Sequence, residues 1–190
     1  MKFRESGMPQ QDYWETLFDV PRILDAFGFC ADTGDVAELG CGYGTFTVPL
    51  AARIRGAVYT LDLAPTMVLA TQARAKAAGL TNVQARMRDV LADGFGVVSS
   101  SCDACLLFNI LHCEEPVALL HAARETVRPG GLLAVIHWRS DVPTPRGPSL
   151  AIRPRAEQIT TWAEAAGGLR VAGPALVLPP WHFGLKLRRA

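Results

Sequence analysis

The stretch 36–45 constrains the fold of this chain more than any other. A short apolar run ends at Glu38, glycines then alternate with other residues at Gly40, Gly42 and Gly44, and a helix-like pattern follows. Glycines at such positions let the backbone adopt a positive φ and let a ligand come within contact distance. The stretch therefore predicts a strand, a tight turn and a helix, with a ligand held at the turn.

Length and composition narrow the class of protein. The chain has 190 residues, 49% hydrophobic and 19% charged, which predicts one globular domain over residues 1–190. A formal net charge of +1 with no long basic run argues against a nucleic-acid partner. No apolar run reaches the roughly 20 residues that span a bilayer. The N-terminal stretch also lacks the apolar centre of a secretory signal, so we expect a cytoplasmic protein without a membrane partner.

The cysteines give no sign of a metal site. Five cysteines without an export signal predict reduced thiols, in keeping with a cytoplasmic setting. Cys102 and Cys105 form a lone C-x-x-C pair, whereas zinc sites of this type use four ligands. We expect no metal, and both cysteines as small buried residues of a strand. Composition leaves monomer and homodimer open.

Strand-like and helix-like segments alternate along the chain. Such alternation predicts right-handed βαβ units. We therefore expect an α/β, doubly wound, Rossmann-like three-layer sandwich with a seven-stranded, mostly parallel sheet. The last strand is predicted to be antiparallel because no helix separates it from the strand before it. The expected strands are 35–38, 57–62, 82–87, 102–108, 132–138, 169–175 and 182–187.

Two segments are predicted to cover the ligand edge of this sheet. Residues 11–29 have helical apolar spacing that Pro21 interrupts, which predicts an N-terminal helical cap within residues 1–30. Residues 139–153 contain three prolines and a glycine among polar residues, which is typical of a surface loop. We expect this loop to be an active-site loop, with an ordinary connection as the alternative.

The glycine turn disfavours two common phosphate ligands. The third glycine of the dinucleotide fingerprint is replaced by Thr45, which we expect to cap the following helix instead. Glu38, directly before the glycines, would repel a pyrophosphate at close range. No Gly-Lys-Ser/Thr follows, so a P-loop is excluded. The turn favours a ligand with a cationic end.

The glycine turn at 38–44 is followed by motifs at the ends of the next three predicted strands, at residues 61–67, 88–90 and 108–113, and by a turn before the fifth strand at 128–131. In this order and spacing they resemble the motifs of class I S-adenosylmethionine-dependent methyltransferases. One such motif is weak, but five in order over residues 36–137 indicate the family. The chain is most similar to the small-molecule branch that includes methyltransferase type 11 and the quinone-biosynthesis methyltransferases.

The resemblance implies S-adenosylmethionine as cofactor and a small organic molecule as methyl acceptor. It also implies which positions contact the cofactor. The glycine turn would meet its amino acid end, a strand-end acid its ribose, and the following residues its adenine. These implied cofactor positions are Glu38, Gly40, Cys41, Gly42, Asp62, Leu63, Met67, Asp89, Val90 and Asn109.

Aromatic residues are expected to line the binding site of the methyl acceptor, because the N-terminal helix and the late loops tend to cover that site in the family. Core packing explains Trp14 and Trp181 nearly as well. The expected substrate-pocket residues are Tyr13, Trp14, Tyr43, Trp138 and Trp181.

Methyl transfer from a sulfonium is an in-line displacement, for which the protein supplies alignment and a water-poor site. A general base is needed only if the acceptor must lose a proton. His112 and His137 follow the fourth and fifth predicted strands on the ligand side and are candidate bases. The alternative for each is a hydrogen bond to a loop carbonyl.

Other functions stay open at this point. One is a non-catalytic S-adenosylmethionine-binding regulatory protein. Another is a nicotinamide-dependent oxidoreductase, which Thr45 and the lack of a plausible hydride-site Tyr/Lys pair disfavour. Residues 109–112 also lack the Asp/Asn-Pro-Pro-aromatic motif of enzymes that methylate amino groups of nucleic acid or glutamine. Asn109 stands without the acidic cluster of metal-dependent catechol-type enzymes, so a small organic acceptor is expected.

Overall fold

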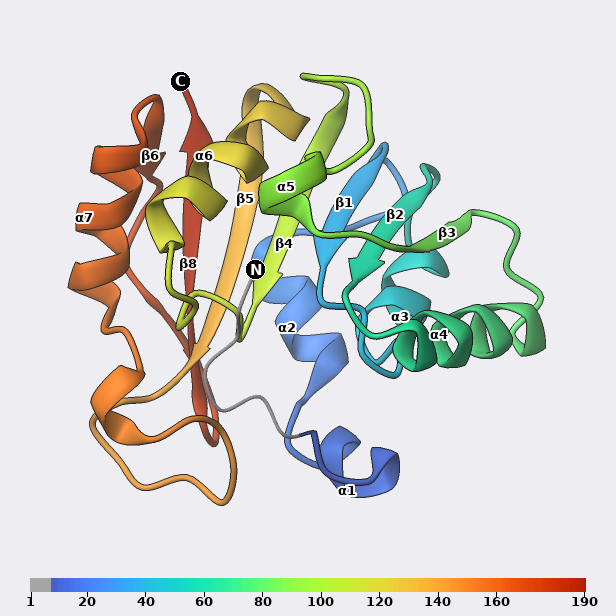
Figure 1. Cartoon of the computed structure of the whole chain (residues 1–190), viewed down its shortest axis with the longest axis horizontal. Coiled ribbons are helices and arrows are strands. Elements are labelled where there is room, and N and C mark those ends of the chain that lie inside the picture. The colour runs from blue at the N-terminus through green and yellow to red at the C-terminus, as the bar shows by residue number, and fades with distance from the viewer. Residues whose placement is uncertain (1–7) are drawn as a thin grey trace.

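The computed structural model describes residues 8–190, so the first seven residues of the expected N-terminal cap lie outside the described residues (Figure 1). Its strands join one sheet in the order β3-β2-β1-β4-β5-β8-β6, with β7 paired to β8. The strands are β1 Val36–Leu39, β2 Val58–Asp62, β3 Val83–Met87, β4 Cys102–Phe108, β5 Val127–Trp138, β6 Leu169–Val171, β7 Leu176–Leu178 and β8 His182–Arg189.

The pairing confirms the predicted mostly parallel sheet with an antiparallel last strand. Strands β1 to β5 pair in parallel, and β8 lies antiparallel between β5 and β6. The sheet has eight strands where seven were predicted. Of the strand expected over 169–175 only 169–171 forms β6, because Gly173 at a φ of 88° and Pro174 end it, and the additional strand β7 follows at 176–178.

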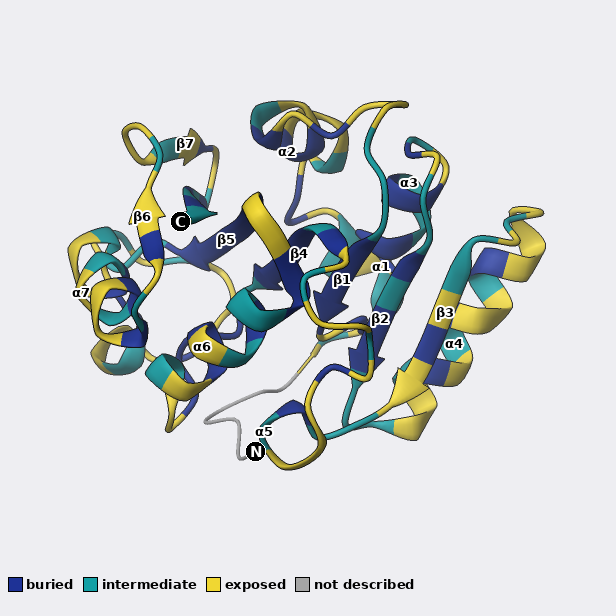
Figure 2. Cartoon of the chain, turned by 90° about the horizontal axis from the view of Figure 1, so that it is seen from above, coloured by how far each residue is buried: buried dark blue, intermediate teal, exposed yellow. Residues whose placement is uncertain are grey.

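Helices cover both faces of this sheet (Figures 1 and 2). Helices α5, α6 and α7 pack on one face, and α2 and α3 pack on the other. Pro21, Pro65 and Pro116 each stand in the first turn of a helix, where a missing N–H is tolerated. The helices are α1 Gln11–Glu15, α2 Val20–Phe27, α3 Thr47–Ala51, α4 Pro65–Ala77, α5 Val90–Asp93, α6 Pro116–Thr126, the 3₁₀ turn η1 Leu150–Ile152, and α7 Ala156–Ala166.

Strand β4 is buried on both faces, as its continuous apolar run predicted. Leu107 faces α6 and α7, whereas Leu106 faces α2 and α3, because side chains alternate along a strand. Cys102 and Cys105 are completely buried, which confirms them as small core residues. The centre of the sheet is therefore buried (Figure 2).

The glycine turn after β1 has the tight geometry that its sequence predicted. Gly40, Gly42 and Gly44 all adopt positive φ, of 85°, 51° and 75°. The Gly40 N–H donates to the Leu61 carbonyl at 2.7 Å, which fastens the turn to β2. The expected helix cap at Thr45 is wrong, because the turn continues for one more residue and α3 begins at Thr47.

Several further properties concern residues 8–190 as a whole. Nowhere in this range do three His, Cys, Asp or Glu side chains gather in a way that could hold a metal ion. None of the helices described there has the length and apolar character needed to cross a membrane. All five cysteines are free thiols.

We predict that Gly56→Ala strongly destabilises the fold. A Cβ at Gly56 would lie 2.1 Å from the Gly34 carbonyl carbon, so the backbones that lead into β1 and β2 would have to separate. The expected loss in free energy of unfolding is about 3 kcal/mol, measured by urea denaturation. The control Gly79→Ala, where a Cβ meets nothing within 4 Å, should lose only about 1 kcal/mol from its positive φ. Equal losses would contradict the packing argument.

Candidate functional site

A cavity of about 580 Å³ lies at the carboxyl ends of β1, β2 and β4, within the range of about 300–1,000 Å³ typical of small-molecule sites. The glycine turn and the start of α4 form one side. The turn after β4, the N-terminal segment and residues 146–148 form the other. The cavity brings together these residues predicted for the site: Gly40, Cys41, Gly42, Asp62, Leu63, Met67, Asn109, Trp14, Tyr43, Trp138 and His112.

Six predicted residues are not part of this lining: Glu38, Asp89, Val90, Tyr13, Trp181 and His137. Asp89 accepts a hydrogen bond from the Leu91 N–H at 3.1 Å and caps α5, which begins at Val90. Tyr13 is 41% exposed, and Trp181 packs half-buried against the aromatic side of the core. Sequence periodicity placed these side chains on the correct elements, but it could not show which way each one faces.

Asp62 is positioned by the turn that it stabilises. Its Oδ2 accepts a hydrogen bond from the Gly42 N–H at 3.0 Å, and its Oδ1 accepts one from the Ala64 N–H at 2.9 Å. A carboxylate has about four lone-pair sites; the Cys41 thiol also donates to Oδ2, at 3.8 Å, so the room for a further donor lies on Oδ1. A fixed carboxylate at the end of β2 is well suited to accept bonds from a pair of hydroxyl groups.

Glu38 lies buried beside the glycine turn and joins three elements. Its Oε2 accepts hydrogen bonds from the hydroxyls of Thr47, at 2.5 Å, and of Thr60, at 2.6 Å. Burial raises the pKa of Glu38 to about 7; the two threonine bonds act in the opposite direction, and the nearby Asp62 charge raises it further. The carboxyl group is therefore a structural contact between β1, β2 and α3.

Two buried polar atoms of the cavity residues have no hydrogen-bond partner within residues 8–190: Thr45 Oγ1 and Asn109 Oδ1. Asn109 has a φ of 56°, an uncommon conformation for a residue other than glycine. A buried polar atom without a partner costs roughly 1–3 kcal/mol, so native proteins rarely keep one without a reason. Both residues line this cavity.

The two candidate bases have different environments. His112 lines the cavity, whereas His137 is completely buried and its ring centroid lies 5.5 Å from that of His112. Burial lowers the pKa of His137 to about 3, with a smaller contribution from His112. A base this weak accepts a proton poorly at neutral pH, so the geometry favours His112.

His182 belongs to this region but was not identified from the sequence. Its Nε2 lies 3.4 Å from Asn109 Nδ2, and its ring centroid lies 4.1 Å from that of Trp138 and 4.6 Å from that of Phe18. Burial also lowers the pKa of His182 to about 3. Its separation from Asn109 by 73 positions left no local pattern that could have linked them.

The loop over 139–153 is held against the cavity by Arg153. This buried side chain donates hydrogen bonds to the carbonyls of Pro148, Arg139 and Arg146 at 2.7, 2.9 and 3.2 Å. A Cβ at Gly147 would lie 2.8 Å from the Trp138 ring, so only glycine allows so close an approach. Arg153 was not identified from the sequence, because its partners are backbone carbonyls that carry no residue signature.

The N-terminal segment closes the cavity from the opposite side. The Tyr43 hydroxyl donates a hydrogen bond to the Pro9 carbonyl at 3.0 Å, and Met8 lies against Gly42. Arg146 reaches across from the loop and lies 5.7 Å above the Tyr13 ring. Tyr13 therefore contacts the loop rather than the interior of the cavity.

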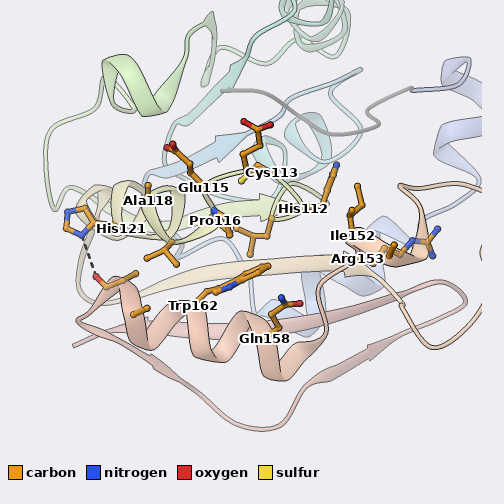
Figure 3. Close-up of a pocket in the computed structure, with 16 residues that line it drawn as sticks. His112, Cys113, Glu115, Pro116, Ala118, His121, Ile152, Arg153, Gln158 and Trp162 are labelled. Carbon is orange, nitrogen blue, oxygen red and sulfur yellow. Dashed lines mark hydrogen bonds between the residues drawn. The ribbon is translucent and has the colours of Figure 1, made fainter.

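A second cavity, of about 930 Å³, lies between α6 and α7 (Figure 3). Residues 111–118 and His121 form one wall, and Gln158, Trp162 and residues 165–166 form the other. Residues 151–153 lie at the end near the first cavity. His112 lines both cavities and stands where they adjoin.

Comparisons with known proteins agree with this geometry. Residues 36–131 match the family model described as "Methyltransferase domain". The chain is 31% identical over 97 residues to a ubiquinone biosynthesis O-methyltransferase of Cereibacter sphaeroides, covering 50% of this chain and 38% of the relative. It is 33% identical over 108 residues to the nocamycin O-methyltransferase of Saccharothrix syringae, covering 53% and 36%. The chain thus spans less than half the length of these relatives.

A solved structure extends the likeness of the fold to nearly the whole chain. It is described as a SAM dependent methyltransferase from Aquifex aeolicus, and it superposes with a TM-score of 0.83 at 23% identity. The match covers 95% of this chain and 94% of that one.

We predict that Glu38→Gln removes a pH-dependent loss of stability. Because the native pKa of about 7 exceeds the ordinary 4.5, the folded state binds this proton more tightly than the unfolded state. Glu38 therefore lowers wild-type stability as the pH rises from 4.5 to 7. The free energy of unfolding of the variant, relative to wild type, should increase by roughly 3 kcal/mol over this window.

Urea denaturation at a series of pH values measures this difference. The matched control is Glu164→Gln, which alters an exposed carboxylate of α7. A difference between Glu38→Gln and wild type that does not change with pH would contradict the assignment of Glu38 as a buried carboxyl group.

Proposed function

This chain belongs to the methyltransferase domain family, and on that premise we propose that it transfers a methyl group from S-adenosylmethionine to a small organic acceptor. One observation carries the proposal. Asp62, Thr45 and Asn109 line one cavity beside the glycine turn. In this proposal residues 1–190 form a single domain, and the cavity is its active site.

The residues of this cavity fit the cofactor. Asp62 would receive the two ribose hydroxyls, and Leu63 and Met67 would cover the adenine. Asn109 and the turn at 40–42 would hold the amino acid end. The N–H groups of Gly40 and Gly42 already donate hydrogen bonds within the protein, so these glycines would contribute the shape of the turn around the cofactor and not a hydrogen bond to it.

The other predicted cofactor residues act from the margin of the cavity. Glu38 is a positioning residue that holds the turn through Thr47 and Thr60. The Arg88 N–H donates to the Asp62 carbonyl at 3.0 Å, which brings the neighbouring Asp89 and Val90 to the same sheet edge. There Asp89 and Val90 would contact the edge of the adenine ring.

S-adenosylmethionine supplies, when bound, a sulfonium methyl group that an aligned nucleophile can displace. The chain contributes a site with little water, because Trp14, Trp138 and residues 146–148 enclose it. The loop over 139–153 and the N-terminal cap would open to admit ligands and close over them. Trp138 also packs against Trp14, with 6.3 Å between their ring centroids.

The acceptor is proposed to react through oxygen. Both relatives described above carry O-methyltransferase names, which supports this choice. His112 would take up the hydroxyl proton that leaves as the acceptor oxygen gains the methyl group. The buried His137 would instead support the His112 ring by edge-on packing, at 5.5 Å between centroids.

We predict that Asp62→Asn weakens S-adenosylmethionine binding about 10- to 100-fold, because one charged hydrogen-bond acceptor is lost. Isothermal titration with S-adenosylmethionine, S-adenosylhomocysteine and NAD measures this. The control Asp32→Asn, on an exposed turn, should bind like wild type. Asp62 also accepts a hydrogen bond from the glycine turn, so thermal unfolding of both variants checks that the folded state keeps its stability. Absence of binding of either adenosyl compound to wild type at millimolar concentration would refute the proposed function, and binding of NAD alone would favour an oxidoreductase.

We predict that His112→Ala lowers turnover at least about 100-fold, the usual contribution of a positioned base. A radiolabelled-methyl screen over pools of hydroxylated small molecules identifies the acceptor and then measures kcat. His137→Ala should retain S-adenosylmethionine binding and lose far less turnover. If both alanine variants keep near-normal turnover with the true acceptor, neither histidine is the base.

A further inference from the structure

We propose that His182, which lies outside the cavity lining, is a positioning residue that holds Asn109 and the turn after β4 in place for the amino acid end of S-adenosylmethionine. The inference rests on the proposed function, in which Asn109 helps to hold that end of the cofactor. It follows from the contact between the two side chains, from the backbone of Asn109 and from the packing around the His182 ring.

The two side chains meet although they belong to distant parts of the chain. His182 Nε2 lies 3.4 Å from Asn109 Nδ2, and 73 positions separate the two residues. In the sheet, β5 lies between β4 and β8, so the imidazole ring of His182 reaches across one strand to the end of β4. The contact therefore joins the wall of the cavity to a strand that does not pair with β4.

The backbone of Asn109 has an uncommon conformation that this contact supports. Its φ of 56° is left-handed, which few residues other than glycine adopt, although asparagine tolerates it. Here the chain leaves β4, and the next residue, Ile110, lines the cavity. Ile110 Cδ1 lies only 3.0 Å from the position that a Cβ would take on Gly40, so Ile110 packs closely on the glycine turn. A bond that holds the Asn109 carboxamide therefore also fixes how the two turns meet.

The charge state of His182 suits this bond. The residue is 2% exposed, and burial lowers its pKa to about 3, with a smaller contribution from Arg153. The ring is therefore neutral at neutral pH, with one donor nitrogen and one acceptor nitrogen. With Asn109 Nδ2 facing the ring, the amide N–H donates and His182 Nε2 accepts. A charged imidazolium has no acceptor nitrogen for this bond.

The ring also packs between two aromatic side chains, and this packing can be separated from the bond. Its centroid lies 4.6 Å from that of Phe18, in a stacked arrangement, and 4.1 Å from that of Trp138. His182→Phe keeps a flat ring for this packing but loses the acceptor nitrogen. His182→Gln loses the ring but keeps a polar group near the position of Nε2. The two variants therefore distinguish a positioning role from a purely structural one.

The test compares two ligands that differ only at the end in question. S-adenosylhomocysteine carries the amino acid end of the cofactor, whereas 5′-methylthioadenosine keeps the adenine and ribose and lacks that end. Isothermal titration measures the Kd of both ligands for wild type, His182→Phe and His182→Gln. Asn109→Gly and the double variant with His182→Phe complete the set, because glycine accepts the positive φ and removes the carboxamide. Urea denaturation checks that each variant is folded, and His182→Leu replaces His182→Phe if that variant is not.

We expect His182→Phe to bind S-adenosylhomocysteine about five- to tenfold more weakly, with the Kd of 5′-methylthioadenosine changed less than about twofold. His182→Gln should bind both ligands within about threefold of wild type, even though it loses the stacked ring. In the Asn109→Gly background, His182→Phe should weaken S-adenosylhomocysteine no further.

Three results would overturn the inference and leave the proposed function intact. They are an unchanged Kd of S-adenosylhomocysteine in His182→Phe, an equal loss for both ligands, and an equal loss with or without the Asn109 side chain. A loss in His182→Gln as large as that in His182→Phe would also overturn it, since the ring alone would then matter. Failure of wild type to bind S-adenosylhomocysteine at millimolar concentration would instead overturn the proposed function, and with it this role of His182.

Discussion

The hydrogen bonds from Thr47 and Thr60 to the buried Glu38 carboxyl group are the contacts on which the site depends. They join β1, its neighbour β2 and the helix that follows the glycine turn, at the place where the sheet is open to a ligand. Burying a carboxyl group is unfavourable unless it is hydrogen-bonded, so the three elements must keep this arrangement. Asp62 then holds the turn itself through the Gly42 N–H.

The walls of the site are also part of the core. Trp138 is nearly fully buried and packs against His182 and Trp14, yet it lines the cavity at the glycine turn. Arg153 holds the loop against this ring from outside, with its Cζ 5.9 Å from the ring centre. Such shared packing makes the cavity rigid on one side. The side formed by the N-terminal segment is held by the hydrogen bond from Tyr43 to Pro9, by the ion pair of Glu15 with Arg74 and by the packing of Trp14.

Local patterns predicted the elements that carry the site, and they failed where distant residues decide. The apolar run at 102–108 and the glycines after β1 behave as predicted, because each depends on its own neighbours in the chain. The strand expected at 169–175 ends at Val171, before Gly173 and Pro174, and β7 forms outside the expected segment. Thr45 does not cap α3, because the turn continues past it. In the first case Gly173 and Pro174 are strand-breaking residues within the expected strand, and in the second the glycine turn extends to Phe46.

By itself, the sequence determined the parallel α/β sheet, the glycine turn and the row of polar residues at the strand ends, because periodicity and turn chemistry act over a few residues. Only the tertiary structure decided what those residues face. It buried Glu38 and His137, left His112 between two cavities, and opened a gap between α6 and α7. Burial and side-chain direction depend on contacts between residues far apart in the chain, and these exist only once the elements have packed.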